Sequence, residues 1–335
     1  MSTIVFLDDV LRQTDVTFKK LLSNMRQGCM DDDDIKLIFA RVLDKLPDGE
    51  KQAFQDDGLH LVPTWKQANG INLKYLRDNL VTPMARYQAK LNSCKANGTN
   101  CCISECNFPL RSLLCVGAKV MLLINFLVEY KIMNGSIGIV RMICFNHPDG
   151  DRNDSDDLQQ YVVVEFPDST IPEDQKLIPN MPSTWVPIPL VQRRCEKNCC
   201  SIEAMPLMIC KSLSIHKSQG MTVGQGKPFT KVVVYLPPSG NKCPGLELVA
   251  VSRAVALNDF AVGNTETELT RQTLSRIGNT NAYKARKEFL QQTRARSEPS
   301  QEITKLAITA LDPAVDRDKT FEGGCKFLLD WYRSL

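Results

Sequence analysis

The chain has 335 residues, a length that suits two domains or one large one. Hydrophobic residues make up 43% and charged residues 24%, which excludes a collagen-like, disordered or disulfide-scaffold protein. The formal net charge is only +3, but residues 211–300 contain 13 Lys and Arg against 6 Asp and Glu. A basic segment in a nearly neutral chain favours a polyanion as partner on that side.

The first elements that the sequence predicts are two helices. Apolar residues at helical spacing predict a helix over 16–27, with Asp15 as N-cap and Gly28 as the stop. A second helix is expected after the acidic run Asp31–Asp34, whose charge suits a helix N-terminus and equally a solvated turn. Its apolar face consists of Ile35, Ile38, Phe39, Val42 and Leu46.

The pattern then changes from helical to β. A short buried strand is expected over 58–64 and a helix over 69–80. Further strands are predicted over 118–124, 137–145 and 161–166, with a hairpin turn at Asn134-Gly135 and a polar loop over 146–160. Residues 167–206 hold many prolines and are expected to be irregular with short strands. The middle of the chain therefore resembles a small all-β insert.

After Pro206 strands and helices alternate again. The expected elements are a strand over 207–215, a polar turn over 216–222, a strand over 232–236, a helix over 245–255, a strand over 260–262 and a basic helix over 281–296. An apolar cluster near the end, Phe327–Leu329 with Trp331, has no docking surface that the sequence identifies.

Targeting and redox signals point to an intracellular protein. No signal peptide is visible, and the longest apolar stretch, Leu113–Val128, contains polar residues, so no membrane span is expected. The 13 cysteines are expected to be reduced thiols in a nuclear or cytosolic protein, with a mitochondrial location left open. No structural zinc is expected, because the spacings Cys102/Cys106 and Cys195/Cys199 match no zinc motif.

Two segments concentrate groups that carry chemistry. Ser214–Thr222 places an imidazole, an ammonium, hydroxyls, an amide and a glycine directly after a strand. Such a loop can hold phosphates or a nucleic-acid backbone, and a plain polar turn is the alternative. Pro244–Ala254 carries Arg253 on an otherwise apolar helix. A buried guanidinium there needs a partner, which is either a phosphate or a carboxylate such as Glu247.

Together these segments resemble motifs V and VI of the superfamily 1B DNA helicases of the petite-integration-frequency (PIF) type, with RecD as a more distant relative. The resemblance is carried by Ile215–Thr222, which has the form Ile-His-Lys-Ser-Gln-Gly-x-Thr, and by Val249–Ala254, which has the form Val-Ala-x-Ser-Arg-Ala. Val116–Asn125 and Asn134–Val140 are similar to the start of that family's inserted β-domain, and Leu11–Gly28 resembles its segment after motif III.

The resemblance covers roughly residues 4–263 and implies an α/β fold. It implies a second RecA-like motor lobe with an inserted small β-barrel, preceded by a helical remnant of the first lobe. The implied domains are 1–57 for the remnant, 58–112 and 206–263 for the second lobe, 113–205 for the barrel and 264–335 for a helical extension of unknown role.

The resemblance also implies roles for single residues. Arg253 would be the arginine finger that stabilises charge on the transferred phosphoryl group. Arg12 would be a second catalytic, phosphate-facing arginine, with a surface charge as the alternative. Gln219 and Gly220 would lie between the nucleotide and the DNA, and would bind the cofactor together with Arg253. The implied contacts to the DNA backbone are His216, Lys217, Ser218 and Thr222.

Three ring side chains carry weaker expectations. His60 has no acidic or cysteine neighbour and is expected in the core or a turn. Trp65 and Trp185 are candidates for stacking on nucleobases, but core packing is favoured for each.

Two parts of a complete motor are missing from the sequence. The only Gly-Lys pair, Gly226-Lys227, lacks the spacing of the phosphate loop G-x-x-x-x-G-K-[ST]. Ile4–Asp9 ends in two acids but is not expected to be a magnesium site, because Leu11–Gln13 places it after that motif in the family order. The complete family motor uses ATP and Mg²⁺, and this chain alone is expected to hold neither.

The expected function is therefore the C-terminal portion of an ATP-dependent DNA helicase. The complete motor would translocate on single-stranded DNA and unwind duplex, and this chain would be inactive without the missing first motor lobe. The alternative is a non-catalytic, single-stranded nucleic-acid-binding remnant of a mobile-element helicase. A structural protein without nucleic acid is disfavoured by the intact Ile215–Thr222 segment.

Overall fold

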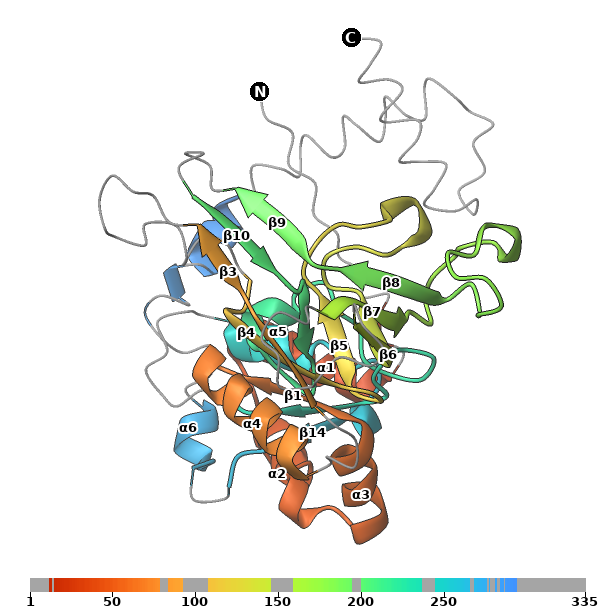
Figure 1. Cartoon of the computed structure of the whole chain (residues 1–335). Helices are drawn as coiled ribbons and strands as arrows, with labels where there is room; N and C mark the ends of the chain where they lie inside the picture. Colours follow the sequence, from red (N-terminus) through yellow and green to blue (C-terminus); the bar gives the residue numbers. More distant parts are fainter. Residues whose placement is uncertain are drawn as a thin grey trace, which may run out of the picture. The chain divides into compact units, whose positions relative to one another are not determined.

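The computed structural model describes residues 12–13, 15–78, 84–92, 108–145, 159–194, 200–236, 245–265, 268–275, 277 and parts of 281–293 (Figure 1). Most of the described residues belong to one compact unit, Arg12–Asn279. Its helices are α1 (Val16–Gln27), α2 (Asp32–Ala40), α3 (Asp48–Asp57), α4 (Trp65–Asp78), α5 (Leu246–Val251) and α6 (Arg271–Ser275). None of the helices in the described part of the chain has the length and hydropathy that a membrane span requires.

Helix α1 has the ends that the sequence predicts. One carboxylate oxygen of Asp15 accepts hydrogen bonds from the backbone N–H groups of Thr17, at 2.9 Å, and Phe18, at 3.2 Å. These bonds satisfy donors that have no partner inside the helix. Gly28 ends the helix in a left-handed conformation, with φ at 68°. The predicted apolar face is buried, namely Phe18, Leu21, Leu22 and Met25.

Helix α2 begins as predicted but ends early. Asp31 and Asp34 form a capping box at its start, which shows that the acidic run begins a helix. The helix ends at Ala40, before the last two residues of the predicted apolar face. The chain leaves the helix there because Val42 forms a parallel bridge with Val262, at the edge of the central sheet.

The central sheet is parallel and has four strands. In spatial order these are β12 (Ser212–Ser214), β1 (Gly58–Val62), β13 (Lys231–Val234) and β14 (Phe260–Val262). Val232 and Val234 face the core that contains α1 and α5, whereas Val233 packs with Phe54 of α3 on the other face. A parallel sheet covered on both faces confirms the predicted α/β class.

Helix α4 packs against β1 and β12, and it starts earlier than the sequence predicts (Figure 1). The hydroxyl oxygen of Thr64 accepts from the N–H of Gln67 at 3.3 Å, and the Gln67 amide oxygen accepts from the N–H of Thr64 at 3.2 Å. This reciprocal cap fixes the first helical turn, so the helix begins at Trp65.

The strands from Met84 to Ile209 are antiparallel. They form a pair, β2 (Met84–Gln88) with β4 (Arg111–Cys115), and a three-stranded sheet of β3 (Lys90–Asn92), β10 (Ser201–Ala204) and β9 (Val191–Arg194). A five-stranded sheet follows the order β11 (Leu207–Ile209), β5 (Lys119–Leu122), β6 (Ile137–Phe145), β7 (Gln159–Glu165) and β8 (Trp185–Pro189).

This antiparallel part has its own apolar core and contains the three strands that the sequence predicts after residue 113. Gly135, with φ at 94°, lies in a turn as predicted, but that turn is not the whole connection between β5 and β6. The connection runs over 123–136 and also contains a 3₁₀ turn at Val128–Tyr130. Closure of these strands into a barrel, the helical remnant of a first lobe and the domain boundaries stay predictions.

The predicted strand over 207–215 is wrong as a single element. It divides into β11, which pairs with β5, and β12, which pairs with β1 of the central sheet. The buried side chain of Asn72 stabilises the crossing. Its amide donates to the carbonyls of Ile209 and Ser212, at 3.2 and 3.0 Å, and its oxygen accepts from the Ser212 N–H at 2.7 Å.

Lys119 of β5 makes a second connection between the antiparallel part and the parallel sheet. Its ammonium donates to the carboxylate of Asp57 at the end of α3 and, at 2.7 Å, to the carbonyl of Pro228. The other carboxylate oxygen of Asp57 accepts from the N–H and hydroxyl of Thr230, at 2.9 and 2.6 Å. Burial raises the pKa of Asp57, but these hydrogen bonds outweigh it and lower the pKa overall.

Several expectations fall outside the described residues. These are the acidic strand-like segment 4–9, most of the loop over 146–160 and the apolar cluster at 327–331. Of the basic helix expected over 281–296, residues 287–293 are helical and described continuously.

Candidate nucleotide and nucleic-acid site

The loop that follows β12 divides its side chains between the interior and the surface. Residues Ile215–Ser218 form a 3₁₀ turn, in which Ile215 and Ser218 are buried. His216, Gln219 and Gly220 are exposed. Gly220 has φ at 87°, in the left-handed region that favours glycine, and a Cβ there would meet no atom within 4 Å. Glycine is therefore needed for the backbone conformation of the loop.

Ser218 does not fit its predicted role as a DNA contact. Its side chain is fully buried, and its hydroxyl donates to the carbonyl of Ile215 at 2.7 Å. The hydroxyl holds the 3₁₀ turn together, and a phosphate outside the loop cannot reach it. The sequence shows a hydroxyl in the loop but not the direction in which it points.

Lys217 is half-buried and lies against apolar groups. Its ammonium nitrogen is 4.0 Å from Sδ of Met208 and 5.7 Å from the centroid of the Trp65 indole. Burial lowers the pKa of Lys217. No ion pair joins Lys217 to a carboxylate within the described ranges, so its charge is open to an external anion.

Trp65 is not in the core, contrary to the prediction for it. Its side chain is 48% exposed at the start of α4, beside Lys217. Trp185 is partly exposed on β8, where Arg141 lies 5.9 Å from its ring centroid. His60 is largely buried on β1, with Nδ1 3.3 Å from the hydroxyl of Tyr235, which confirms its placement in the core.

Arg253 lies just after α5 and binds main-chain oxygens instead of a carboxylate. Its guanidinium donates to the carbonyls of Val249 at 2.8 Å, Met221 at 3.3 Å and Ser218 at 3.4 Å, and to the hydroxyl of Ser252 at 3.0 Å. No salt bridge to Glu247 is present, so this alternative for the Arg253 partner is wrong.

Arg12, which is far from Arg253 in the sequence, contacts the residue next to it. Its guanidinium donates to the carbonyl of Ser252 at 3.0 Å. The neighbouring Gln13 side chain is buried and donates to the carbonyls of Ser252 at 3.0 Å and Ala254 at 2.9 Å. Burial, and then the charge of Arg12, lower the pKa of Arg253 to about 10.

Two guanidinium groups therefore lie near each other. Neither forms an ion pair with a carboxylate in the part of the chain that the structure describes. Such an arrangement suits an anion with several oxygens, such as a phosphate. The exposed Gln219 and Gly220 belong to the loop whose Ser218 and Met221 carbonyls accept from Arg253.

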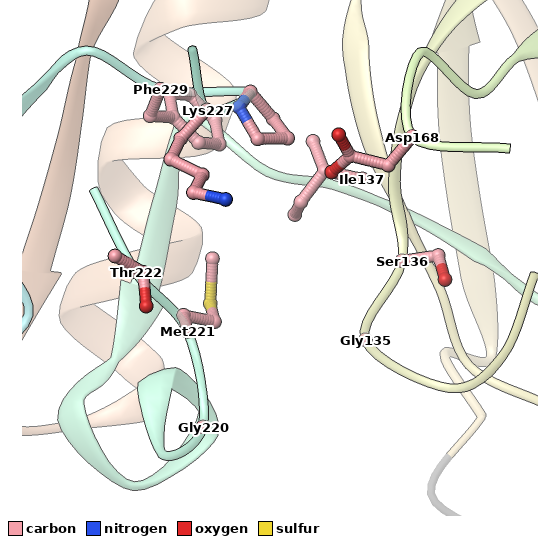
Figure 2. A pocket seen from close by; sticks show the side chains of 10 residues that line it. Gly135, Ser136, Ile137, Asp168, Gly220, Met221, Thr222, Lys227 and Phe229 are labelled. Carbon is pink, nitrogen blue, oxygen red and sulfur yellow. The ribbon is translucent and has the colours of Figure 1, made fainter. Parts of the chain in front are cut away.

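A cleft of about 250 Å³ lies beside this loop. Figure 2 shows Gly220, Met221, Thr222, Lys227 and Phe229 on one side, and the β5–β6 hairpin with Ser136 and Ile137 and the nearby Asp168 on the other. Thr222 and Lys227 supply a hydroxyl and an ammonium to one wall. Both groups can donate to a phosphate backbone, and Lys227 has no predicted role, while the Asp168 carboxylate adds a negative charge to the opposite wall.

No metal centre is visible among the described residues. They contain no group of three or more His, Cys, Asp or Glu side chains that could hold a metal ion. The described cysteines Cys29, Cys115, Cys144 and Cys210 are free thiols. The C-x3-C pairs at 102/106 and 195/199 lie outside the described residues.

Three residues of the site were missed or misplaced by the sequence analysis. Gln13 lies in the segment Leu11–Gly28, which carries part of the resemblance, but the resemblance gave it no role. Lys227 lies outside the matching segments, and only the folded chain brings it to the cleft. Trp65 gave no signal in the sequence, because its exposure follows from the position at which α4 begins.

The parallel sheet and the antiparallel insertion together define the class of the fold, which is α/β, and the paired arginines lie beside the loop that follows β12. Comparison with solved structures shows that the fold is similar to that of Pif1 helicases. The Pif1 helicase from Candida albicans is 24% identical, with a TM-score of 0.57, and the match covers 81% of this chain and 59% of that one.

A Bacteroides Pif1 helicase in complex with ADP-AlF3 and single-stranded DNA is 21% identical, with a TM-score of 0.55, covering 84% of this chain and 57% of that one. A structure of two coordinating Pif1 helicases at forked double-stranded DNA is 20% identical, with a TM-score of 0.55, covering 83% and 54%. No protein-family model matches the chain, and no curated protein matches it.

These comparisons show that the chain has the fold of part of a Pif1 helicase, which confirms the resemblance at the level of the fold. The chain spans between 54% and 59% of the length of these three structures, which is consistent with a C-terminal half.

Proposed function

We propose that this chain is the C-terminal portion of an ATP-dependent DNA helicase that moves along single-stranded DNA and unwinds duplex. The observation that carries the proposal is the meeting of Arg12 and Arg253 at Ser252, without a carboxylate partner among the described residues. The similarity to Pif1 structures, some of them bound to single-stranded DNA, supports it.

On the nucleotide side, Arg253 acts as the arginine finger and Arg12 as a second cation facing the terminal phosphate. Gln219 and Gly220 lie between the nucleotide and the DNA. Bound ATP with Mg²⁺ supplies the free energy of phosphoanhydride hydrolysis. Because the sequence holds no phosphate loop, the rest of the nucleotide site is assigned to a first motor lobe that acts as partner.

On the DNA side, His216, Lys217 and Thr222 contact the backbone, and Lys227 adds a cation to the cleft. Ser218 is reassigned as a positioning residue, because its buried hydroxyl fixes the 3₁₀ turn that presents Lys217. We also infer an intracellular location, nuclear or cytosolic, from the expectation of reduced thiols.

The DNA side is tested by fluorescence anisotropy with labelled single-stranded oligonucleotides of several sequences and salt concentrations. We expect weak binding with a log–log salt slope of roughly −0.7 for each of about two to four phosphates. Lys217→Ala lowers the affinity about equally for all sequences, because a phosphate contact carries no base information. Ser218→Ala leaves the affinity nearly unchanged in conditions where the variant is folded.

Lys36→Ala is the matched control for charge, because Lys36 is exposed on α2 and pairs with Asp33 at 3.1 Å. It should bind as the parent chain does. Absence of binding at low salt, or an effect of Lys217→Ala on one sequence only, contradicts the proposed DNA contact.

The second candidate is a non-catalytic remnant that binds single-stranded nucleic acid. It is favoured by one observation, the absence of G-x-x-x-x-G-K-[ST] from the 335 residues. The two candidates are separated by reading the coding sequence upstream of Met1. An in-frame phosphate loop supports the helicase portion, and its absence supports the remnant.

A further inference from the structure

Trp65 is a large aromatic side chain that the fold leaves on the surface. It is 48% exposed, although burying an indole contributes more to stability than burying almost any other side chain. The reciprocal cap between Thr64 and Gln67 fixes the first turn of α4, where Trp65 is the first residue. The indole is therefore presented from a rigid helix end.

The surroundings of Trp65 are cationic. Helix α4 has no acidic residue in its first turn and carries Lys66 next to Trp65. The segment 212–222, which supplies Lys217, also lacks Asp and Glu. A surface of this kind attracts polyanions.

Lys217 gives the second, independent observation. Its ammonium lies 5.7 Å from the centre of the Trp65 ring and only 4.0 Å from a thioether sulfur. It is half-buried, and no carboxylate neutralises it within the described ranges. An ammonium partly removed from water binds an incoming anion more strongly than one that is fully solvated.

We propose that Trp65 and Lys217 together form a platform for one nucleotide of a single strand. The exposed part of the indole stacks on the nucleobase, and the Lys217 ammonium pairs with the backbone phosphate. This inference rests on the proposed binding of single-stranded DNA and deepens it, because it names the side chain that stacks on the base. Since every base has a flat π-face, the platform accepts all four bases.

Tryptophan fluorescence tests the platform directly in the full chain. The chain has three tryptophans, so a variant with Trp185→Phe and Trp331→Phe keeps only Trp65. Oligodeoxythymidylate of about 15 nucleotides should quench its emission on binding. An abasic backbone of the same length carries the same phosphates and should bind more weakly and leave the emission almost unchanged.

Substitutions then separate stacking from charge. Trp65→Leu should raise the Kd for oligodeoxythymidylate roughly 5- to 100-fold, as removal of one base-stacking aromatic does. Trp65→Phe should retain most of the affinity. In Trp65→Leu the difference between the normal and the abasic oligonucleotide should shrink, whereas in Lys217→Gln it should persist.

Trp185→Leu is the matched control, because Trp185 also lies beside a cation, Arg141 at 5.9 Å, but on β8 and not beside Lys217. It should bind as the parent chain does, and circular dichroism confirms that each variant is folded. Unchanged affinity of folded Trp65→Leu, with Lys217→Ala still weakened, overturns the platform and leaves the proposed function intact. Absence of any DNA binding by the parent chain overturns both.

Discussion

Neighbouring polar side chains in the 214–222 loop have different physical roles. The Ser218 hydroxyl is fully buried and binds a carbonyl three residues earlier. The Lys217 ammonium reaches past Met208 toward Trp65, where it has no carboxylate partner among the described residues. Their order in the sequence predicts a loop rich in donors. Which donor faces outward depends on the 3₁₀ turn, and a pattern of residue types does not reveal that.

The burial of His60 makes the stability of the fold depend on pH. Burial, and then the charge of Lys211, lower the pKa of His60 from 6.5 to about 4. The Tyr235 hydroxyl is the other polar group that faces its ring. Between these two pKa values the unfolded chain binds the proton more tightly than the folded chain does. The stability is therefore full above the unfolded pKa and falls as the pH is lowered toward 4.

We expect the free energy of unfolding to fall by up to about 3 kcal/mol across this range. Guanidinium denaturation at several pH values measures the slope. His60→Phe keeps the ring next to Tyr235 but cannot titrate, so the difference between the parent and the variant isolates His60. An equal slope in both proteins would show that His60 does not contribute.

At the scale of elements, Asn72 decides where one strand ends and the next begins. Six of the nine residues from Leu207 to Ile215 are apolar, and the sequence predicts a single strand there. The chain instead changes sheet within it, because the Asn72 amide on α4 bonds to Ile209 and Ser212. Ser212 is 140 residues away in sequence, and no local pattern contains that information.

We predict that Asn72→Leu lowers the free energy of unfolding by about 2–4 kcal/mol, because it leaves buried backbone groups of Ile209 and Ser212 without partners. Asn69→Leu is the control on the exposed side of the same helix and should change stability by less than about 0.5 kcal/mol. Urea denaturation of both variants measures the difference. Equal stability of the two would show that the Asn72 hydrogen bonds do not hold the crossing.

Elements whose ends are encoded locally were predicted well. The cap of Asp15 and the stop at Gly28 are short-range patterns, and the structure contains both. For the acidic run Asp31–Asp34 the sequence left a helix start and a solvated turn open, and the capping box in the structure decides for the helix. Helix α3 was missed, because Phe54 is its one buried residue and it shows no apolar stripe. Strands β2 and β3 were missed because their pairing partners lie far away in the sequence.

At the scale of the whole molecule, the candidate site depends on contacts between distant parts of the chain. Arg12 and Ser252 are separated by 240 positions. Their proximity follows from the family resemblance but not from any periodicity. A salt bridge between Arg253 and Glu247 would be a local contact, which a sequence pattern can suggest. In the structure the Arg253 guanidinium instead donates to main-chain carbonyls, such as that of Val249.

We predict that the purified 335-residue chain shows no ATP hydrolysis above background, with or without single-stranded DNA. The chain has no phosphate loop, so Arg253 has no cradled triphosphate on which to act. A phosphate-release assay measures this, and Arg253→Ala should be indistinguishable from the parent. DNA-stimulated turnover that Arg253→Ala abolishes would contradict the prediction.

The contacts of Lys119 hold the two walls of the cleft in place before a ligand binds. The backbone of β5 pairs with β6, which contributes Ile137 to one wall of the cleft. The Lys119 side chain of β5 binds the carbonyl of Pro228 in the other wall and the carboxylate of Asp57. One short strand thus sets the spacing between both walls before any ligand arrives. The entropy of ordering the cleft is lost during folding, so an incoming strand meets a preorganised surface and loses less affinity to reorganisation.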